Sequence, residues 1–188
     1  MSSQRKTLLT PEEYLVLERK SEIKHEYFDG EMFAMVGASK RHNLITANII
    51  RILGNPLLER PCNVYPSDMR VKVSATGKYT YPDVVIACDE ERFDDAEKDT
   101  LLNPVVIIEV LSETTESYDR GKKFEQYQQI ESLVEYLLLA QEPYRIEQYV
   151  RRSNREWRYS EYHDAQDVLR INVIDCELTL KDVYAKVK

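Results

Sequence analysis

The chain has 188 residues, a length typical of one domain, and we expect a single domain over residues 1–188. Hydrophobic residues make up 43% of it and charged residues 31%, which is typical of a soluble globular protein, and no apolar run is long enough to span a membrane. The net charge of −7 excludes non-specific adhesion to nucleic acid through overall charge but leaves a local basic groove open.

The first residues and the cysteines bear on the cellular compartment. Met1–Lys6 is polar and lacks the apolar core of a signal peptide. The cysteines, Cys62, Cys88 and Cys176, show no paired spacing and leave an odd count. The sequence therefore predicts a reduced, cytoplasmic protein with neither a disulfide framework nor a structural zinc site.

Local signals mark the ends of the predicted elements. Thr10 caps a helix whose first turn holds Pro11 and whose Glu13 completes a capping box. Asp29 and Gly30 form the turn of a hairpin between two alternating segments. In chain order, the sequence predicts helices over residues 11–20, 39–58, 116–130 and 181–187, and strands over 24–29, 31–36, 63–65, 68–73, 81–88, 104–111, 135–140, 144–151, 156–162 and 168–180.

The segment 104–111 carries the most informative residue of the chain. It is a short apolar run rich in β-branched residues, a pattern typical of a strand buried on both faces, and it contains Glu109. An ionised carboxylate there costs several kcal/mol unless something pairs with it. Asp83 heads the strand 81–88, and acids on two neighbouring strands can share a hard divalent cation. The alternative is that Glu109 pairs with a basic side chain or is protonated near the end of the sheet.

The helix that follows this strand supplies a candidate partner. Its apolar stripe includes Phe124 and Tyr127, and at about 100° per residue Lys123 falls within that stripe whereas Lys122 points away from it. Asp119 and Tyr127 lie four residues on either side of Lys123 and are its stacked neighbours. Lys123 is thus a candidate to face the acids, or else a lysine that extends past the edge of the stripe into solvent.

Other polar residues carry weaker signals. Arg70 and Lys72 alternate with apolar residues in the strand 68–73, which predicts a solvated face. Glu31 follows the hairpin turn and His42 lies in the first turns of a helix, where both are most simply surface residues. Near the turn between the strands 144–151 and 156–162, either a phosphate-binding patch or plain solubility explains the cluster of Arg151, Arg152, Arg155 and Arg158.

The order of Asp83, Glu109 and Lys123 resembles the PD-(D/E)XK nuclease superfamily. Pro82 and Asp83 match the first half of its motif, and the run from Glu109 to Leu111 matches the second half. In that superfamily the acids bind Mg²⁺, and a lysine normally stands two residues after the second acid, where this chain has Leu111. Some branches move the lysine to the next helix, and Lys123 fits that arrangement.

The chain as a whole is similar to the Uma2-like family, also catalogued as DUF820, of restriction-endonuclease-like proteins. The matching stretches are Thr10–Tyr14, Phe28–Glu31, His42–Asn43, Pro82–Val85, Glu109–Ser112, Asp119–Tyr127 and Glu135–Tyr136. The resemblance implies an α/β, restriction-endonuclease-like fold, in which a mixed central sheet is flanked by helices and the site lies at one edge of the sheet. It implies a Mg²⁺-dependent endonuclease that hydrolyses DNA, with Mn²⁺ as a substitute cation, and it leaves a homodimer open.

Roles for individual residues follow from this resemblance. Asp83, Glu109 and the carbonyl of Val110 would bind the metal, and Lys123 would orient water or stabilise charge. Weaker candidates are Glu31 near the metal, His42 near phosphate or water, and Tyr127. The alternative is a catalytically inactive module that binds nucleic acid or protein on the same fold, which Leu111 at the usual lysine position favours.

Overall fold

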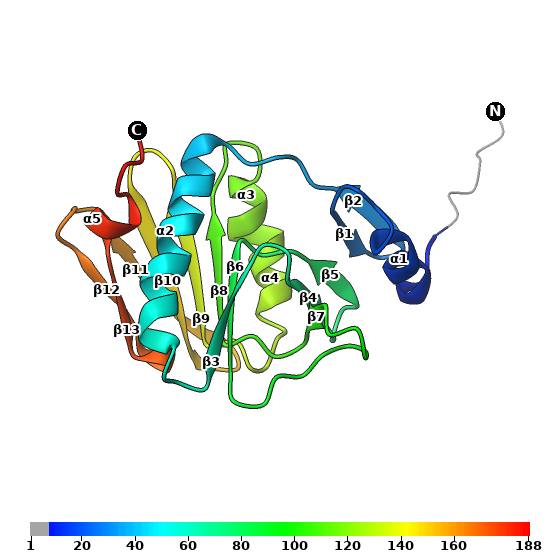
Figure 1. Ribbon diagram of the computed structural model, residues 1–188. Helices are drawn as coiled ribbons and strands as arrows, with labels where there is room; N and C mark the ends of the chain where they lie inside the picture. Colours follow the sequence, from blue (N-terminus) through cyan, green and yellow to red (C-terminus); the bar gives the residue numbers. More distant parts are fainter. Residues whose placement is uncertain (1–7) are drawn as a thin grey trace.

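Two larger β-sheets and one two-stranded sheet, together with helices, make up the computed structural model, which describes residues 8–188 (Figure 1). The predicted absence of a signal peptide in Met1–Lys6 concerns residues outside that range. The helices are α1 (Pro11–Glu18), α2 (Lys40–Leu57), α3 (Glu116–Tyr118), the π-helix η1 (Asp119–Lys123), α4 (Phe124–Tyr127), the 3₁₀-helix η2 (Asn172–Ile174) and α5 (Leu180–Val183). The strands are β1 (His25–Phe28), β2 (Glu31–Ala34), β3 (Cys62–Pro66), β4 (Arg70–Val73), β5 (Lys78–Thr80), β6 (Val84–Cys88), β7 (Thr100–Leu101), β8 (Val106–Val110), β9 (Glu135–Ala140), β10 (Arg145–Ser153), β11 (Glu156–Tyr162), β12 (Val168–Ile171) and β13 (Cys176–Thr179).

The central sheet has the order β11-β10-β9-β8-β6-β3. It is mixed, because β8 pairs in parallel with β9 and antiparallel with β6. Alternation along β8 sends Ile108 and Val110 into the core beneath α2 and α5, and Ile107 into the core beneath α4. Figure 1 shows α2 lying along the first of these faces. The prediction of a strand buried on both faces is confirmed for β8, and helices cover both sides of the sheet as expected.

The second sheet has the order β2-β1-β5-β4-β7 and carries the N-terminal hairpin. Helix α1 begins with the predicted capping box at Thr10 and Glu13. The hairpin turns at Asp29 and Gly30, whose φ angles of 50° and 81° lie in the left-handed region that such a turn requires. Strand β1 then pairs with β5, which brings the N-terminal part of the chain against residues that follow it by some fifty positions.

The helix predicted over residues 116–130 is the largest local departure from expectation. It divides into α3, η1 and α4, and the helical part ends at Tyr127. The hydroxyl of Tyr136 donates to the Asp119 carbonyl at 3.1 Å within the π-helix. After Tyr127, the guanidinium of Arg151 donates to the carbonyls of Gln128, Ile130 and Leu133 and so holds the segment that follows the helix.

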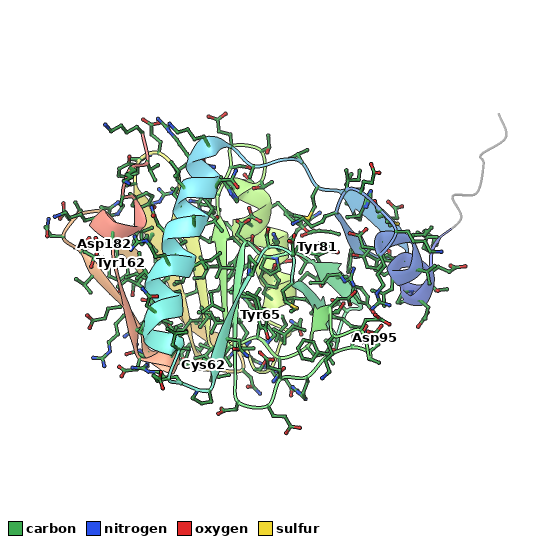
Figure 2. All side chains as sticks on the ribbon, in the orientation of Figure 1. Cys62, Tyr65, Tyr81, Asp95, Tyr162 and Asp182 are labelled. Atoms are coloured by element: carbon green, nitrogen blue, oxygen red, sulfur yellow. A yellow bond between two sulfur atoms is a disulfide. The ribbon has the colours of Figure 1, made fainter. Side chains whose placement is uncertain are left out.

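Arg70 does not lie on a solvated face as predicted. It is 2% exposed and donates to Thr100 and Tyr81, each at 2.9 Å, while its other terminal nitrogen lies 2.7 Å from Asp99. The reason is the parallel pairing of β7 with β4, which brings the acidic segment before β7 over this strand. Alternation in the sequence could not show that a later segment covers the face. Figure 2 labels Tyr81, which directly follows β5.

The cysteine prediction is wrong, because Cys62 and Cys88 are joined by a disulfide. These residues lie directly opposite each other on β3 and β6, so strand register brings together two cysteines that are 26 positions apart. Cys176 is free and buried in the described part of the chain. The disulfide removes the cysteine argument for a reduced compartment, and both the cytoplasmic location and the single domain over residues 1–188 stay predictions.

No helix within residues 8–188 is both long and apolar enough to cross a membrane.

Asp99 gives a prediction about stability and pH. Hydrogen bonds from Arg19 and Arg70 hold the pKa of Asp99 well below its usual range. We expect Asp99→Asn to lower the free energy of unfolding at pH 7 by about 1–3 kcal/mol, because Arg70 loses its carboxylate partner while buried. A lowered folded-state pKa stabilises the fold above the unfolded-state pKa of about 3.9, and this effect is lost as the pH falls through the folded-state pKa.

Chemical denaturation of wild type and variant at several pH values checks this, and the difference between them should shrink on acidification. Asp95→Asn is the matched control, because Asp95 contacts the more exposed Arg19 and should cost less than about 1 kcal/mol. A difference for Asp99→Asn that stays constant from pH 7 to pH 2 would contradict the assignment.

The disulfide gives a second prediction. Titration of thiols in denaturant, on protein purified without reductant, should detect one thiol per chain, that of Cys176. The same titration after reduction should detect all three cysteines. Three reactive thiols before reduction would show that Cys62 and Cys88 are not bonded.

Candidate active site

The predicted acids lie at one end of strand β8. Register pairs Val84 with Ile108, so Asp83 stands one position beyond the last pair of β6 and β8, opposite Glu109. Oδ2 of Asp83 accepts the backbone N–H of Val110 at 2.7 Å. The same oxygen lies 3.1 Å from Nε2 of His42 in the first turn of α2. Asp83 therefore lies across the end of β8 and contacts the helix that covers one face of the sheet.

Glu109 contacts residues of η1 and α4. It is 4% exposed, and its Oε1 lies 2.8 Å from Nζ of Lys123 and accepts the hydroxyl of Tyr127 at 2.8 Å. Burial raises the pKa of Glu109 to about 8 against the opposing charge of Lys123, and the charges of Asp119 and Asp83 add to that rise. The buried carboxylate of Glu109 is therefore paired with a cation, the ammonium of Lys123, which the sequence predicted to face inward.

Lys123 is buried, whereas Lys122 is exposed, as the helical spacing predicted. Its Nζ lies 2.8 Å from Glu109, 3.3 Å from Asp119 on the same π-helix and 3.6 Å from Glu26 on β1. Burial alone would lower the pKa of Lys123, but the charges of Glu109, Glu26 and Asp119 raise it well above its usual value. The ammonium is therefore held in its charged form.

Glu26 is a member of the cluster that the sequence did not indicate. Its Oε2 lies 3.1 Å from Nζ of Lys78 and accepts the hydroxyl of Tyr118 at 3.0 Å, while Thr80 donates to its Oε1. The pairing of β1 with β5 places it there. A glutamate in a short alternating strand is most often a surface residue, so the sequence held no signal that would single it out.

The other sequence candidates are placed as follows. Glu31 lies on β2 opposite Phe28, in the same hairpin that brings Glu26 to the cluster. His42 contacts Asp83 through Nε2, and its Nδ1 is buried without a hydrogen-bond partner among residues 8–188. Arg151 is committed to backbone carbonyls and to the face of Trp157, with its guanidinium carbon 4.5 Å from the ring centroid, which leaves it outside a phosphate-binding patch.

The charges of the cluster do not balance within the described residues. The carboxylates of Glu109, Asp119 and Glu26 face the ammonium groups of Lys123 and Lys78, whereas Asp83 contacts His42. With Glu109, Asp119, Glu26 and the two lysines all ionised, three negative charges meet two positive ones, so one negative charge is in excess. Burial is the main cause of the raised pKa of Glu109, and the charges of Asp119 and Asp83 add to it.

The available carboxylate oxygens suit a cation that needs few ligands from the protein. Among residues 8–188, no group of three or more His, Cys, Asp and Glu side chains is placed to hold a metal. Asp83 accepts its hydrogen bonds on Oδ2 and Glu109 on Oε1, so within this range Oδ1 and Oε2 accept none. Mg²⁺ typically takes one or two carboxylates and completes its shell with water and substrate phosphate, whereas structural zinc needs four protein ligands.

Comparison with known proteins gives a consistent picture. Residues 11–181 match the model of the Uma2 family, which is described as "Putative restriction endonuclease". "Uncharacterized protein slr1290" of Synechocystis sp. is 35% identical over 176 residues, which covers 94% of this chain and 91% of that protein. "Uncharacterized protein sll1609" of the same organism is 37% identical over 154 residues, which covers 82% of this chain and 87% of that protein.

A solved structure is similar over almost its whole length. A crystal structure described as "a putative nuclease belonging to DUF820" from Anabaena variabilis has a TM-score of 0.78 at 15% sequence identity, covering 96% of this chain and 99% of that one. At this identity the likeness shows the fold. The predicted α/β, restriction-endonuclease-like fold with a mixed central sheet flanked by helices is confirmed.

The two adjacent lysines give a prediction with an internal control. Lys123→Met leaves Glu109, Asp119 and Glu26 buried without this ammonium, so we expect the free energy of unfolding to fall by about 3–5 kcal/mol. Lys122→Met changes an exposed residue and should alter stability by less than about 0.5 kcal/mol. Urea denaturation of both variants measures the difference, and equal stabilities would contradict the buried cluster.

Proposed function

The chain belongs to the Uma2 family of restriction-endonuclease-like proteins, and on that premise we propose that it is a Mg²⁺-dependent endonuclease that hydrolyses phosphodiester bonds of DNA. The family supports the nuclease-like activity, and the proposal adds the metal, the substrate and the residues. The reacting centre in this proposal is the end of β8, where Asp83 and Glu109 stand opposite each other.

The observation that carries the proposal is the excess of negative charge in a buried cluster. A protein gains nothing from burying more carboxylates than it can neutralise, since each unpaired charge costs several kcal/mol. A divalent cation bound by Asp83 and Glu109 would remove this cost and bring the pKa of Glu109 back down. The cluster is thus suited to take up a cation, and two carboxylates are enough for Mg²⁺.

Each residue would have its own role in such a site. Asp83 and Glu109 would hold the cation, with the carbonyl of Val110 as a further ligand. When bound, the cation would neutralise charge on the phosphate and acidify a water molecule. Lys123 places a positive charge beside Glu109, where it can stabilise the charge that develops on the phosphate oxygens. Tyr127 fixes the rotamer of Glu109 by its hydrogen bond, and His42 fixes that of Asp83.

Leu111 favours a second candidate function, an inactive binding module. It occupies the position where the superfamily usually carries its lysine and is 3% exposed in the core beneath α4. In that case the ion pair of Lys123 with Glu109 would be structural only, and the protein would bind nucleic acid without cleaving it. Measured cleavage separates the two candidates.

The test is cleavage of plasmid and single-stranded DNA by wild type, Glu109→Gln and Glu113→Gln in a Mg²⁺ titration. We expect cleavage by wild type that EDTA abolishes and that Mg²⁺ or Mn²⁺ restores. Glu109→Gln should lower kcat by about 10²–10³, because it removes both a metal ligand and a charge at the reacting centre. Glu113→Gln is the matched control, since Glu113 is exposed just beyond β8 and should cleave as wild type does.

Calorimetric titration with Mg²⁺ should show weaker binding by Glu109→Gln than by wild type. Equal cleavage by wild type and Glu109→Gln would overturn the assignment of Glu109. A wild type that binds DNA but cleaves none of the substrates in Mg²⁺ or Mn²⁺ would favour the inactive binding module.

A further inference from the structure

The carboxylate of Glu26 makes more hydrogen bonds and ion pairs than charge balance alone would require. Its side chain is 12% exposed and its two oxygens are engaged from different elements. Lys78 and Thr80 reach it from β5, Tyr118 reaches it from α3, and Lys123 reaches it from η1. Each contact fixes the carboxylate in a different direction, so the position of Glu26 is determined by the second sheet and the helical segment together.

Lys78 by itself would be a sufficient partner for Glu26. It lies 3.1 Å away, its side chain is 4% exposed, and its ammonium also lies over the ring of Tyr118 at 4.8 Å from the centroid. Nζ of Lys123 also lies 3.6 Å from Oε1 of Glu26. Because Glu26 does not need this second partner, the reason for the contact must lie in what Lys123 requires. That lysine has Glu109 and Asp119 as closer partners in the structure.

The partners of Lys123 change when Glu109 binds a cation. A carboxylate that holds a divalent ion shares its charge with that ion and attracts an ammonium less strongly. Lys123 is then left with Asp119, on its own π-helix, and with Glu26, on the second sheet. Asp119 moves with the helical segment that carries Lys123, whereas Glu26 is anchored outside it, so Glu26 sets where the ammonium lies relative to β8.

We propose that Glu26 is a positioning residue, which holds the ammonium of Lys123 beside the reacting centre once Glu109 binds a cation, and that Lys78 holds Glu26 in place. This inference rests on the proposed nuclease function. The proposal makes the N-terminal hairpin part of the reacting centre. The second sheet carries both Glu26 and Lys78, whereas the central sheet carries the proposed metal ligands.

The experiment compares Glu26→Gln, the double variant Glu26→Gln/Lys78→Met, and Glu22→Gln as the matched control. Glutamine keeps the shape of Glu26 and one acceptor oxygen, which can accept from Thr80 or from Tyr118, but it lacks the charge that holds Lys123. We expect kcat for DNA cleavage to fall by about 10–100-fold, as for other residues that orient a metal centre from outside it. KM for DNA and the Mg²⁺ dependence should change less than about twofold. Glu22 is exposed in the loop before β1 and its variant should match wild type.

The double variant separates positioning from charge balance. Glu26→Gln alone leaves Lys78 buried without a carboxylate partner and should lower Tm, and removal of the Lys78 ammonium should restore much of the loss. If Glu26 positions Lys123, kcat of the double variant stays low although Tm recovers. Recovery of kcat together with Tm would overturn the proposal, and so would an unchanged kcat in Glu26→Gln.

A second measurement does not depend on cleavage. In protein labelled with ¹⁵N-lysine and loaded with Mg²⁺, the ammonium of Lys123 should give an NMR signal protected from exchange, assigned by its loss in Lys123→Met. We expect this signal to be lost in Glu26→Gln and kept in Glu22→Gln. A protected signal in Glu26→Gln would overturn the positioning role. If wild type cleaves no DNA, the proposed function fails, while this signal still decides whether Glu26 holds Lys123.

Discussion

The buried ammonium of Lys123 and the carboxylates around it form the interaction on which the centre of this protein depends. A charge removed from water is tolerated only when opposite charges and hydrogen bonds replace the water, so each member of such a cluster constrains the others. Here the carboxylates come from different elements, Glu26 from β1, Glu109 from β8 and Asp119 from η1. Their shared ammonium therefore fixes the central sheet, the second sheet and the π-helix relative to one another.

The lysine beside Glu109 comes from the π-helix η1 and not from the strand. In the superfamily pattern the lysine follows the second acid along the strand, and here that position holds Leu111, which packs in the core beneath α4. Asp119 and Lys123 lie four residues apart in η1, and both are buried. Short π-helical segments are rare and often occur at functional sites. The ammonium therefore arrives beside Glu109 from a different element of the same fold.

Much of the local structure and part of the candidate site followed from the sequence. The apolar run around Glu109 indicated a strand buried on both faces, and the spacing of Lys123 and Lys122 indicated which lysine faces inward, because both patterns depend only on local periodicity. The Asp29–Gly30 turn followed from local backbone preference. Resemblance to a family added the nuclease-like fold, which the solved structure from Anabaena variabilis bears out.

What the sequence by itself determined is the position of most of the longer elements, the burial of Glu109 and the side of the helix on which Lys123 lies. It did not indicate β5 or β7, and the single strand predicted over 168–180 is divided into β12, η2 and β13. Only the tertiary structure decided that Glu26 joins the cluster, that Arg70 is covered, and that Cys62 and Cys88 are bonded. Each of these depends on which strands become neighbours and in what register. Strand pairing between distant segments leaves no periodic trace in either strand, whereas burial of a single face does, and this difference separates what could be predicted from what could not.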